Sequence, residues 1–101
     1  MPRVLIVDDS PTIRRMVRAS LQSLSRPVEF AEAASGLEAI ESLALQTADL
    51  IVLDLNMPDM HGLDVLGFVR SQPKFRAIPI IVLTTQDRKS TRLNSSHVKR
   101  S

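Results

Sequence analysis

Three short apolar runs, separated by stretches of helical periodicity, set the strongest limit on how this 101-residue chain can fold. The runs are VLIV at 4–7, LIVL at 50–53 and IPIIVL at 78–83, and each has the length and β-branched content of a strand buried on both faces. A weaker alternating run, VEFAEA at 28–33, fits a strand nearer the edge of a sheet. The sequence therefore predicts four strands.

Helical patterns fill the intervals between these strands. Ser10 and Pro11 fit an N-cap followed by the first helical residue, and a single apolar stripe is expected to follow them: Ile13, Met16, Val17, Leu21 and Leu24. Because Arg14, Arg15 and Arg18 fall largely off this stripe, we expect them on a solvated face.

Two more helices are expected, each with an apolar stripe of its own. The helix over 36–46 carries Leu37, Ile40, Leu43 and Ala44, and the helix over 62–72 carries Leu63, Leu66 and Val69. Strands that alternate with helices in this way predict an α/β fold, in which right-handed crossovers build a parallel sheet covered on both faces.

Composition and charge exclude several classes of protein. No apolar run approaches the roughly 20 residues that span a bilayer, and the absence of cysteine rules out disulfides and thiolate metal sites. Because the chain also shows no signal-peptide pattern at MPRVLIVDD, we expect a cytoplasmic protein that makes no contact with membrane. Residues 1–86 hold eight basic and ten acidic side chains, whereas residues 87–101 hold five basic and one acidic. Because the basic excess belongs to the last fifteen residues, we expect no direct contact of the domain with nucleic acid.

Polar residues follow the predicted strands where each of them ends. Asp8 and Asp9 follow the strand at 4–7, Asp54 follows the strand at 50–53, and Thr84 follows the strand at 78–83. In parallel sheets the carboxyl ends of the strands share one edge, where ligands bind. Carboxylates gathered without His or Cys favour Mg²⁺, which prefers oxygen ligands and leaves room for phosphate. The alternative is that these acids are helix caps and loop residues.

Three segments together resemble the receiver domain of two-component response regulators, most closely the chemotaxis type. They are VLIVDDS, VLDLNMPDMHG and PIIVLTT, and the resemblance covers residues 3–86 in the correct order and spacing. It implies a receiver domain over 1–86 with a flavodoxin-like, doubly wound parallel sheet of strand order 2-1-3-4-5.

The resemblance also implies a role for each site residue. Asp54 would accept a phosphoryl group from a histidine kinase or phosphotransfer protein, and Thr84 would contact that group and report it by shifting. The Mg²⁺ site would be formed by Asp8, acting largely through water, together with Asp9, Asp54 and the backbone carbonyl of Asn56. Such a domain is a phosphorylation-controlled signalling module that assists its own phosphoryl transfer, and its target or fused output domain is not readable from the sequence.

Two other functions stay open. An aspartyl-nucleophile phosphatase of the haloacid-dehalogenase type places a second Asp two residues after the nucleophile, and Asn56 stands there instead. An unphosphorylated interaction module is disfavoured by the acids and Thr84.

The end of the chain departs from the receiver pattern. Receivers continue into a fifth strand that ends in a lysine and a last helix, and we expect this chain to lack both. Read back into codons, 87–97 resembles a synthetic sequencing adaptor, so 87–101 is interpreted as a non-native tail. The alternative is a basic tail that binds nucleic acid or a partner.

Overall fold

The computed structural model describes residues 1–24, 26–57 and 62–83, and these residues form alternating strands and helices. The elements are β1 (Arg3–Val7), α1 (Pro11–Gln22), β2 (Glu29–Ala33), α2 (Gly36–Leu45), β3 (Leu50–Asp54), α3 (Gly62–Ser71) and β4 (Ile80–Leu83). As predicted, α1 begins at Pro11, and the Oγ atom of Ser10 caps it by accepting a hydrogen bond from the Ile13 backbone.

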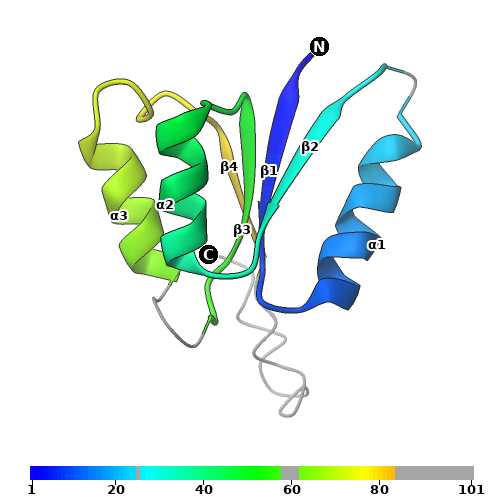
Figure 1. Ribbon diagram of the computed structural model, residues 1–101, viewed down its shortest axis with the longest axis horizontal. Coiled ribbons are helices and arrows are strands. Elements are labelled where there is room, and N and C mark those ends of the chain that lie inside the picture. Colours follow the sequence, from blue (N-terminus) through cyan, green and yellow to red (C-terminus); the bar gives the residue numbers. More distant parts are fainter. Residues whose placement is uncertain (25, 58–61, 84–101) are drawn as a thin grey trace.

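The strands form one parallel sheet with the order β2-β1-β3-β4. Helix α1 lies on one face of this sheet, and α2 and α3 lie side by side on the other (Figure 1). This arrangement confirms the predicted flavodoxin-like α/β class and, for these four strands, the predicted order. The predictions about a fifth strand, a last helix and the tail over 87–101 fall on residues outside those that the structure describes.

The core consists of two layers, one on each face of the sheet. Between the sheet and the pair α2 and α3 lies the larger layer, which includes Leu5, Val7, Leu43, Ile51, Leu53, Val65 and Val69. The smaller layer faces α1 and contains Val4, Ile6 and Val52, against which Val17 and Leu21 pack. Alternate residues of β1 and β3 thus enter opposite layers, which explains why these two strands are apolar throughout.

The predicted helix stripes are only partly correct. On α1, Met16 is exposed and no residue is fully buried, and Leu24, which is also exposed, lies two residues beyond the end of this helix. On α2 and α3, Ala39 and Val65 are buried while Leu37 and Leu63 face solvent. On both helices the buried face is thus rotated by one residue from the prediction, which gave most weight to the largest apolar side chains.

Strand β4 begins at Ile80 and not at Ile78 as predicted. Ile78 is buried in the preceding loop, and Pro79, which has no N–H group for a ladder, contributes only its carbonyl oxygen to the backbone of Ile51. Ile81 and Val82 expose 48% and 42% of their surface, one on each face of the sheet.

Among the described residues, no helix has both the length and the apolar character needed to cross a membrane.

Candidate functional site

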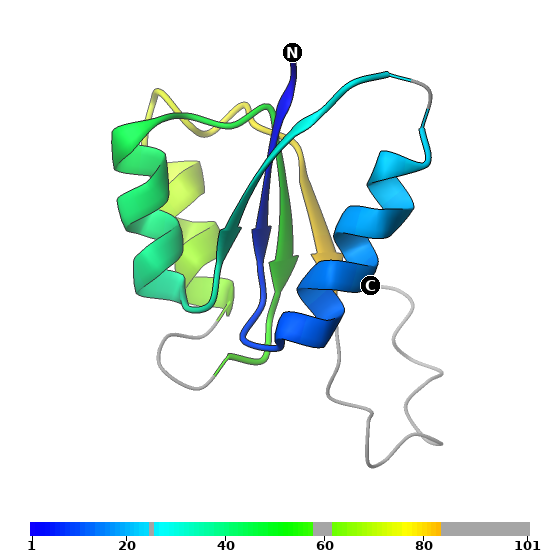
Figure 2. The same ribbon diagram turned by 45° about the vertical axis from the view of Figure 1, so that its right-hand side comes forward.

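The site lies where β1 and β3 end, at the carboxyl edge of the sheet (Figure 2). Val7 pairs with Leu53, so Asp8, the next residue, lies beside Asp54, the last residue of β3. The backbone N–H of Asp8 donates to the Ala33 carbonyl of β2 at 3.0 Å, which continues the sheet for one more residue. Strand pairing alone therefore brings together two acids that are 46 positions apart.

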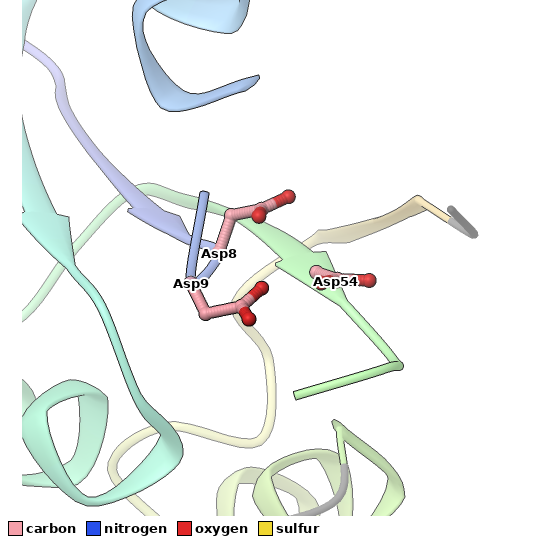
Figure 3. Close-up of side chains that lie close together, drawn as sticks. All are labelled: Asp8, Asp9 and Asp54. Carbon is pink, nitrogen blue, oxygen red and sulfur yellow. The ribbon is translucent and has the colours of Figure 1, made fainter. Parts of the chain in front are cut away.

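Three carboxylates meet at this edge, as the sequence predicts. Each of Asp8, Asp9 and Asp54 offers an oxygen within 4.8 Å of the others (Figure 3). Asp8 and Asp54 are each only 1% exposed, while Asp9 is exposed. The site thus has two buried oxygen ligands and one that solvent reaches.

Asp8 is anchored through one oxygen and leaves the other for a ligand. Its Oδ1 atom accepts a hydrogen bond from the Ser10 backbone at 2.8 Å. Its Oδ2 atom is buried and has no hydrogen-bond partner within the described part of the chain. Burial raises the pKa of Asp8, and repulsion from Asp54 and Asp9 adds to this, while the Ser10 hydrogen bond and the Arg14 charge oppose it.

Asp54 is oriented by the turn that follows it. The backbone N–H of Asn56 donates to Asp54 Oδ1 at 3.0 Å, and the side chain of Asn56 is exposed. Met57, the next residue, is buried in the core. The predicted role of the Asn56 carbonyl as a metal ligand remains a prediction.

Gly62 packs against the backbone of the nucleophile candidate. A Cβ atom added at Gly62 would lie 2.3 Å from the Leu55 Cα atom and 2.6 Å from the Asp54 carbonyl oxygen. The Gly62 N–H also donates to the Leu55 carbonyl at 3.2 Å. A residue without a side chain is therefore required where α3 begins, and the stretch between, 58–61, lies outside the described residues.

Arg14 is a residue of the site that the sequence analysis missed. It was expected on the solvated face, but its side chain is only 17% exposed, and its Nη1 atom donates to the Asp8 carbonyl at 2.7 Å. Arg15 and Arg18 are exposed as expected. The sequence does contain a sign of this contact: Arg14 lies only six residues after Asp8, so its long side chain can reach the end of the strand.

Thr84 lies outside the described residues, so its predicted contact with a phosphoryl group remains a prediction. The residue before it, Leu83, is the register partner of Asp54, and the Leu83 carbonyl accepts from the Leu55 backbone at 3.2 Å. The end of the described stretch of β4 is thus adjacent to the acid cluster.

The acid cluster fits a hard divalent cation. Its side-chain ligands are all carboxylate oxygens, one of which is buried without a hydrogen bond among the described residues. A cation of the Mg²⁺ type prefers such ligands and would offset the repulsion that raises the pKa of Asp8.

Comparison with known proteins shows that this chain is similar to response regulators and their receiver domains. The response regulator receiver domain family matches residues 4–99. Chemotaxis protein CheY1 of Helicobacter pylori is 42% identical over 89 residues, which cover 87% of this chain and 71% of that protein. Further curated matches include the CheY chemotaxis protein of Pseudomonas aeruginosa.

Two solved structures have the same fold. The phosphorylated cyanobacterial phytochrome response regulator RcpA has a TM-score of 0.76 at 31% identity, with 83% of this chain and 65% of that chain covered. The response regulator TrrA from Thermotoga maritima, in complex with Mg²⁺-BeF, has a TM-score of 0.75 at 35% identity, with 91% and 77% covered. The chain thus spans about two thirds to three quarters of the length of these relatives.

Proposed function

Because the chain belongs to the family of response regulator receiver domains, we propose that Asp54 accepts a phosphoryl group from a histidine kinase or phosphotransfer protein. The observation that carries this proposal is the meeting of three carboxylates at one sheet edge, with Asp54 on the central strand β3. The phosphorylated state of RcpA in its crystal structure supports the same chemistry.

Asp54 has the properties of a nucleophile that needs no general base. The Asn56 N–H holds the Oδ1 atom of Asp54 in one orientation, and a carboxylate oxygen can attack phosphorus directly. In the transfer, a carboxylate oxygen of Asp54 forms a bond to phosphorus while the bond from phosphorus to the imidazole nitrogen of the donor breaks. The released imidazole nitrogen takes a proton from solvent, so the product is an aspartyl phosphate.

Asp8, Asp9 and Asp54, with the backbone carbonyl of Asn56, would hold Mg²⁺. When bound, the cation would screen the repulsion between the carboxylates and the incoming phosphoryl oxygens. By holding the cation, Asp8 and Asp9 would allow the two buried carboxylates, those of Asp8 and Asp54, to lie close to a negatively charged phosphoryl group. The Mg²⁺-BeF complex of TrrA supports this assignment.

Thr84 would contact the transferred group and couple it to an output surface. It directly follows Leu83, the register partner of Asp54, so a shift of this residue would act on β4. Aspartyl phosphate adds charge and hydrogen-bond acceptors, which bias such a two-state element. We place this switch in a chemotaxis-type signalling pathway of the cytoplasm, with a separate target or a fused output domain.

Phosphoryl incorporation tests the proposed function. The chain is incubated with MgCl₂ and acetyl phosphate, and intact-mass spectrometry measures the fraction that gains one phosphoryl group. Wild type is expected to gain a phosphoryl group, and Asp54→Asn is expected not to gain one. Asp64 is an exposed acid on α3 outside the cluster, so Asp64→Asn is expected to match wild type. Equal incorporation in wild type and Asp54→Asn contradicts the assignment of Asp54, and no incorporation in wild type favours the interaction module.

A further inference from the structure

Arg14 connects the acid cluster to two neighbouring elements. Its Nη1 atom donates to the main-chain carbonyl of Asp8 at 2.7 Å, and its Nε atom donates to Glu32 Oε1 on β2 at 2.9 Å. Its own backbone lies in the first turn of α1, where its N–H donates to the Ser10 carbonyl at 3.1 Å. One side chain thus links α1, β2 and the end of β1.

The guanidinium of Arg14 is held in a fixed orientation by Glu32. The second oxygen of Glu32 accepts from Arg18 Nη1 at 2.7 Å, and the Arg18 guanidinium lies over the Phe30 ring, 5.2 Å from its centroid. These hydrogen bonds from two arginines keep the pKa of Glu32 below its ordinary value, so it remains an anion. Arg14 therefore approaches Asp8 from a fixed direction.

The carbonyl that Arg14 binds belongs to the peptide between Asp8 and Asp9. Rotation of this peptide would move both carboxylates, because one precedes it and the other follows it. The Asp8 N–H is fixed by Ala33 and the Asp8 Oδ1 atom by Ser10, and Arg14 fixes the carbonyl, so that, among the contacts of the described residues, only Oδ2 is left for a cation. Arg14 cannot itself bind a cation, since guanidinium has no acceptor.

We infer that Arg14 is a positioning residue, which holds the Asp8–Asp9 peptide so that both carboxylates are directed at one cation beside Asp54. This inference rests on the proposed function, because it presupposes that the cluster binds Mg²⁺. Arg14 acts on the ligands and touches neither the cation nor the phosphoryl group. Its loss should weaken cation binding without removing a ligand.

The test compares two arginine substitutions that break the same ion-pair network. Arg14→Met loses the contacts with Glu32 and Asp8, whereas Arg18→Met loses the contacts with Glu32 and the Phe30 ring and keeps the Asp8 carbonyl bonded. MgCl₂ is titrated into the full chain, and the amide shifts of Asp9 and Asn56 report binding by NMR. The Kd for Mg²⁺ is expected to rise about 10-fold in Arg14→Met, which is the lower end of the effect of losing a residue that orients a metal ligand. In Arg18→Met the Kd is expected to stay within about 2-fold of wild type, because the ion pair that this variant loses is exposed.

A second readout separates positioning from general destabilisation. With acetyl phosphate as donor, Arg14→Met should need more Mg²⁺ for half-maximal phosphorylation, yet approach the wild-type rate when Mg²⁺ is saturating. Arg14→Lys retains the positive charge, with its donors on a single nitrogen, but not the planar fork, so its Kd should lie between those of wild type and Arg14→Met. If Arg14→Met does not fold, Arg14→Lys is compared with Arg18→Lys in the same titration.

Each outcome decides the inference. Equal Mg²⁺ affinity in the Arg14 and Arg18 variants overturns it, whether both match wild type or both are weakened alike. A wild-type chain whose Asp9 and Asn56 amides do not respond to Mg²⁺ overturns the proposed function and this inference with it. Weakened binding that is confined to the Arg14 variants supports both.

Discussion

Asp8 carries the electrostatic cost of the site. Its carboxylate is almost fully buried, lies within 4.8 Å of two other acids, and has one oxygen that no described group hydrogen-bonds. Burial, aided by repulsion from Asp54 and Asp9, raises its pKa above the ordinary value of 3.8. Without a cation, the folded protein is therefore less stable when Asp8 is ionised than when it is neutral.

This cost predicts that Asp8→Asn stabilises the metal-free protein at neutral pH. The Asn side chain can still accept the Ser10 hydrogen bond but carries no charge, so the gain should be about 1 kcal/mol, the scale typical of single substitutions. Because the folded pKa of Asp8 is raised, wild type gains stability as the pH falls through that pKa toward 3.8, and the variant does not. Thermal unfolding in EDTA at several pH values measures the difference.

The advantage of Asp8→Asn should therefore shrink as the pH is lowered. Addition of Mg²⁺ should reverse it, because the cation binds and stabilises wild type more than a variant that lacks one ligand. Asp64→Asn, at an exposed position, controls for the loss of a negative charge alone. A metal-free Asp8→Asn protein that is less stable than wild type at neutral pH would contradict this explanation.

At the scale of elements, the start of α3 is fixed by the absence of one side chain. Gly62 lies against the Leu55 Cα atom and the Asp54 carbonyl, and both neighbours are backbone, which cannot rotate away. Gly67, in the interior of the same helix, has open space where a Cβ atom would be. The two glycines of α3 thus differ in whether a methyl group can be accommodated.

Alanine substitution of the two glycines should change stability in opposite directions. Gly62→Ala is expected to destabilise by about 1–3 kcal/mol or more, because the backbone after Asp54 must shift. Gly67→Ala is expected to stabilise by about 1 kcal/mol, since alanine is the better helix former. Urea unfolding measures both changes, and a Gly62→Ala protein as stable as Gly67→Ala would show that the close packing at Asp54 is absent in solution.

Much of the site was predictable because strand pairing is encoded in short apolar runs. The runs at 4–7 and 50–53 end at Asp8 and Asp54, and parallel pairing of their strands then brings the acids together. Helix faces were less predictable: Met16 and Leu63 are large and apolar, yet exposed, because burial depends on which element lies opposite. The contact of Arg14 with the site was not predicted, because helical spacing gives only the direction in which a Cβ atom points. It does not give the position of the guanidinium group at the end of a long side chain.

At the scale of the whole molecule, the sheet and its flanking helices serve mainly to position one edge. β1 and β3 are buried on both faces, which makes the ends of these strands a rigid base for the acids. β4, which pairs with β3, is less covered, with Ile81 and Val82 exposed. The rigid centre of the sheet thus carries the proposed chemistry, and the more exposed strand leads to Thr84, the proposed reporter of phosphorylation.

The most direct measurement is to identify the residue that carries the phosphoryl group. After incubation with Mg²⁺ and acetyl phosphate, borohydride reduction converts an aspartyl phosphate to homoserine, and peptide mapping by mass spectrometry locates it. Conversion at Asp54 alone is the expected result, dependent on Mg²⁺ and lost in EDTA. Conversion at Asp8 or Asp9 instead of Asp54, or equal conversion without any divalent cation, would contradict the proposal that these two acids hold Mg²⁺ for a phosphoacceptor on β3.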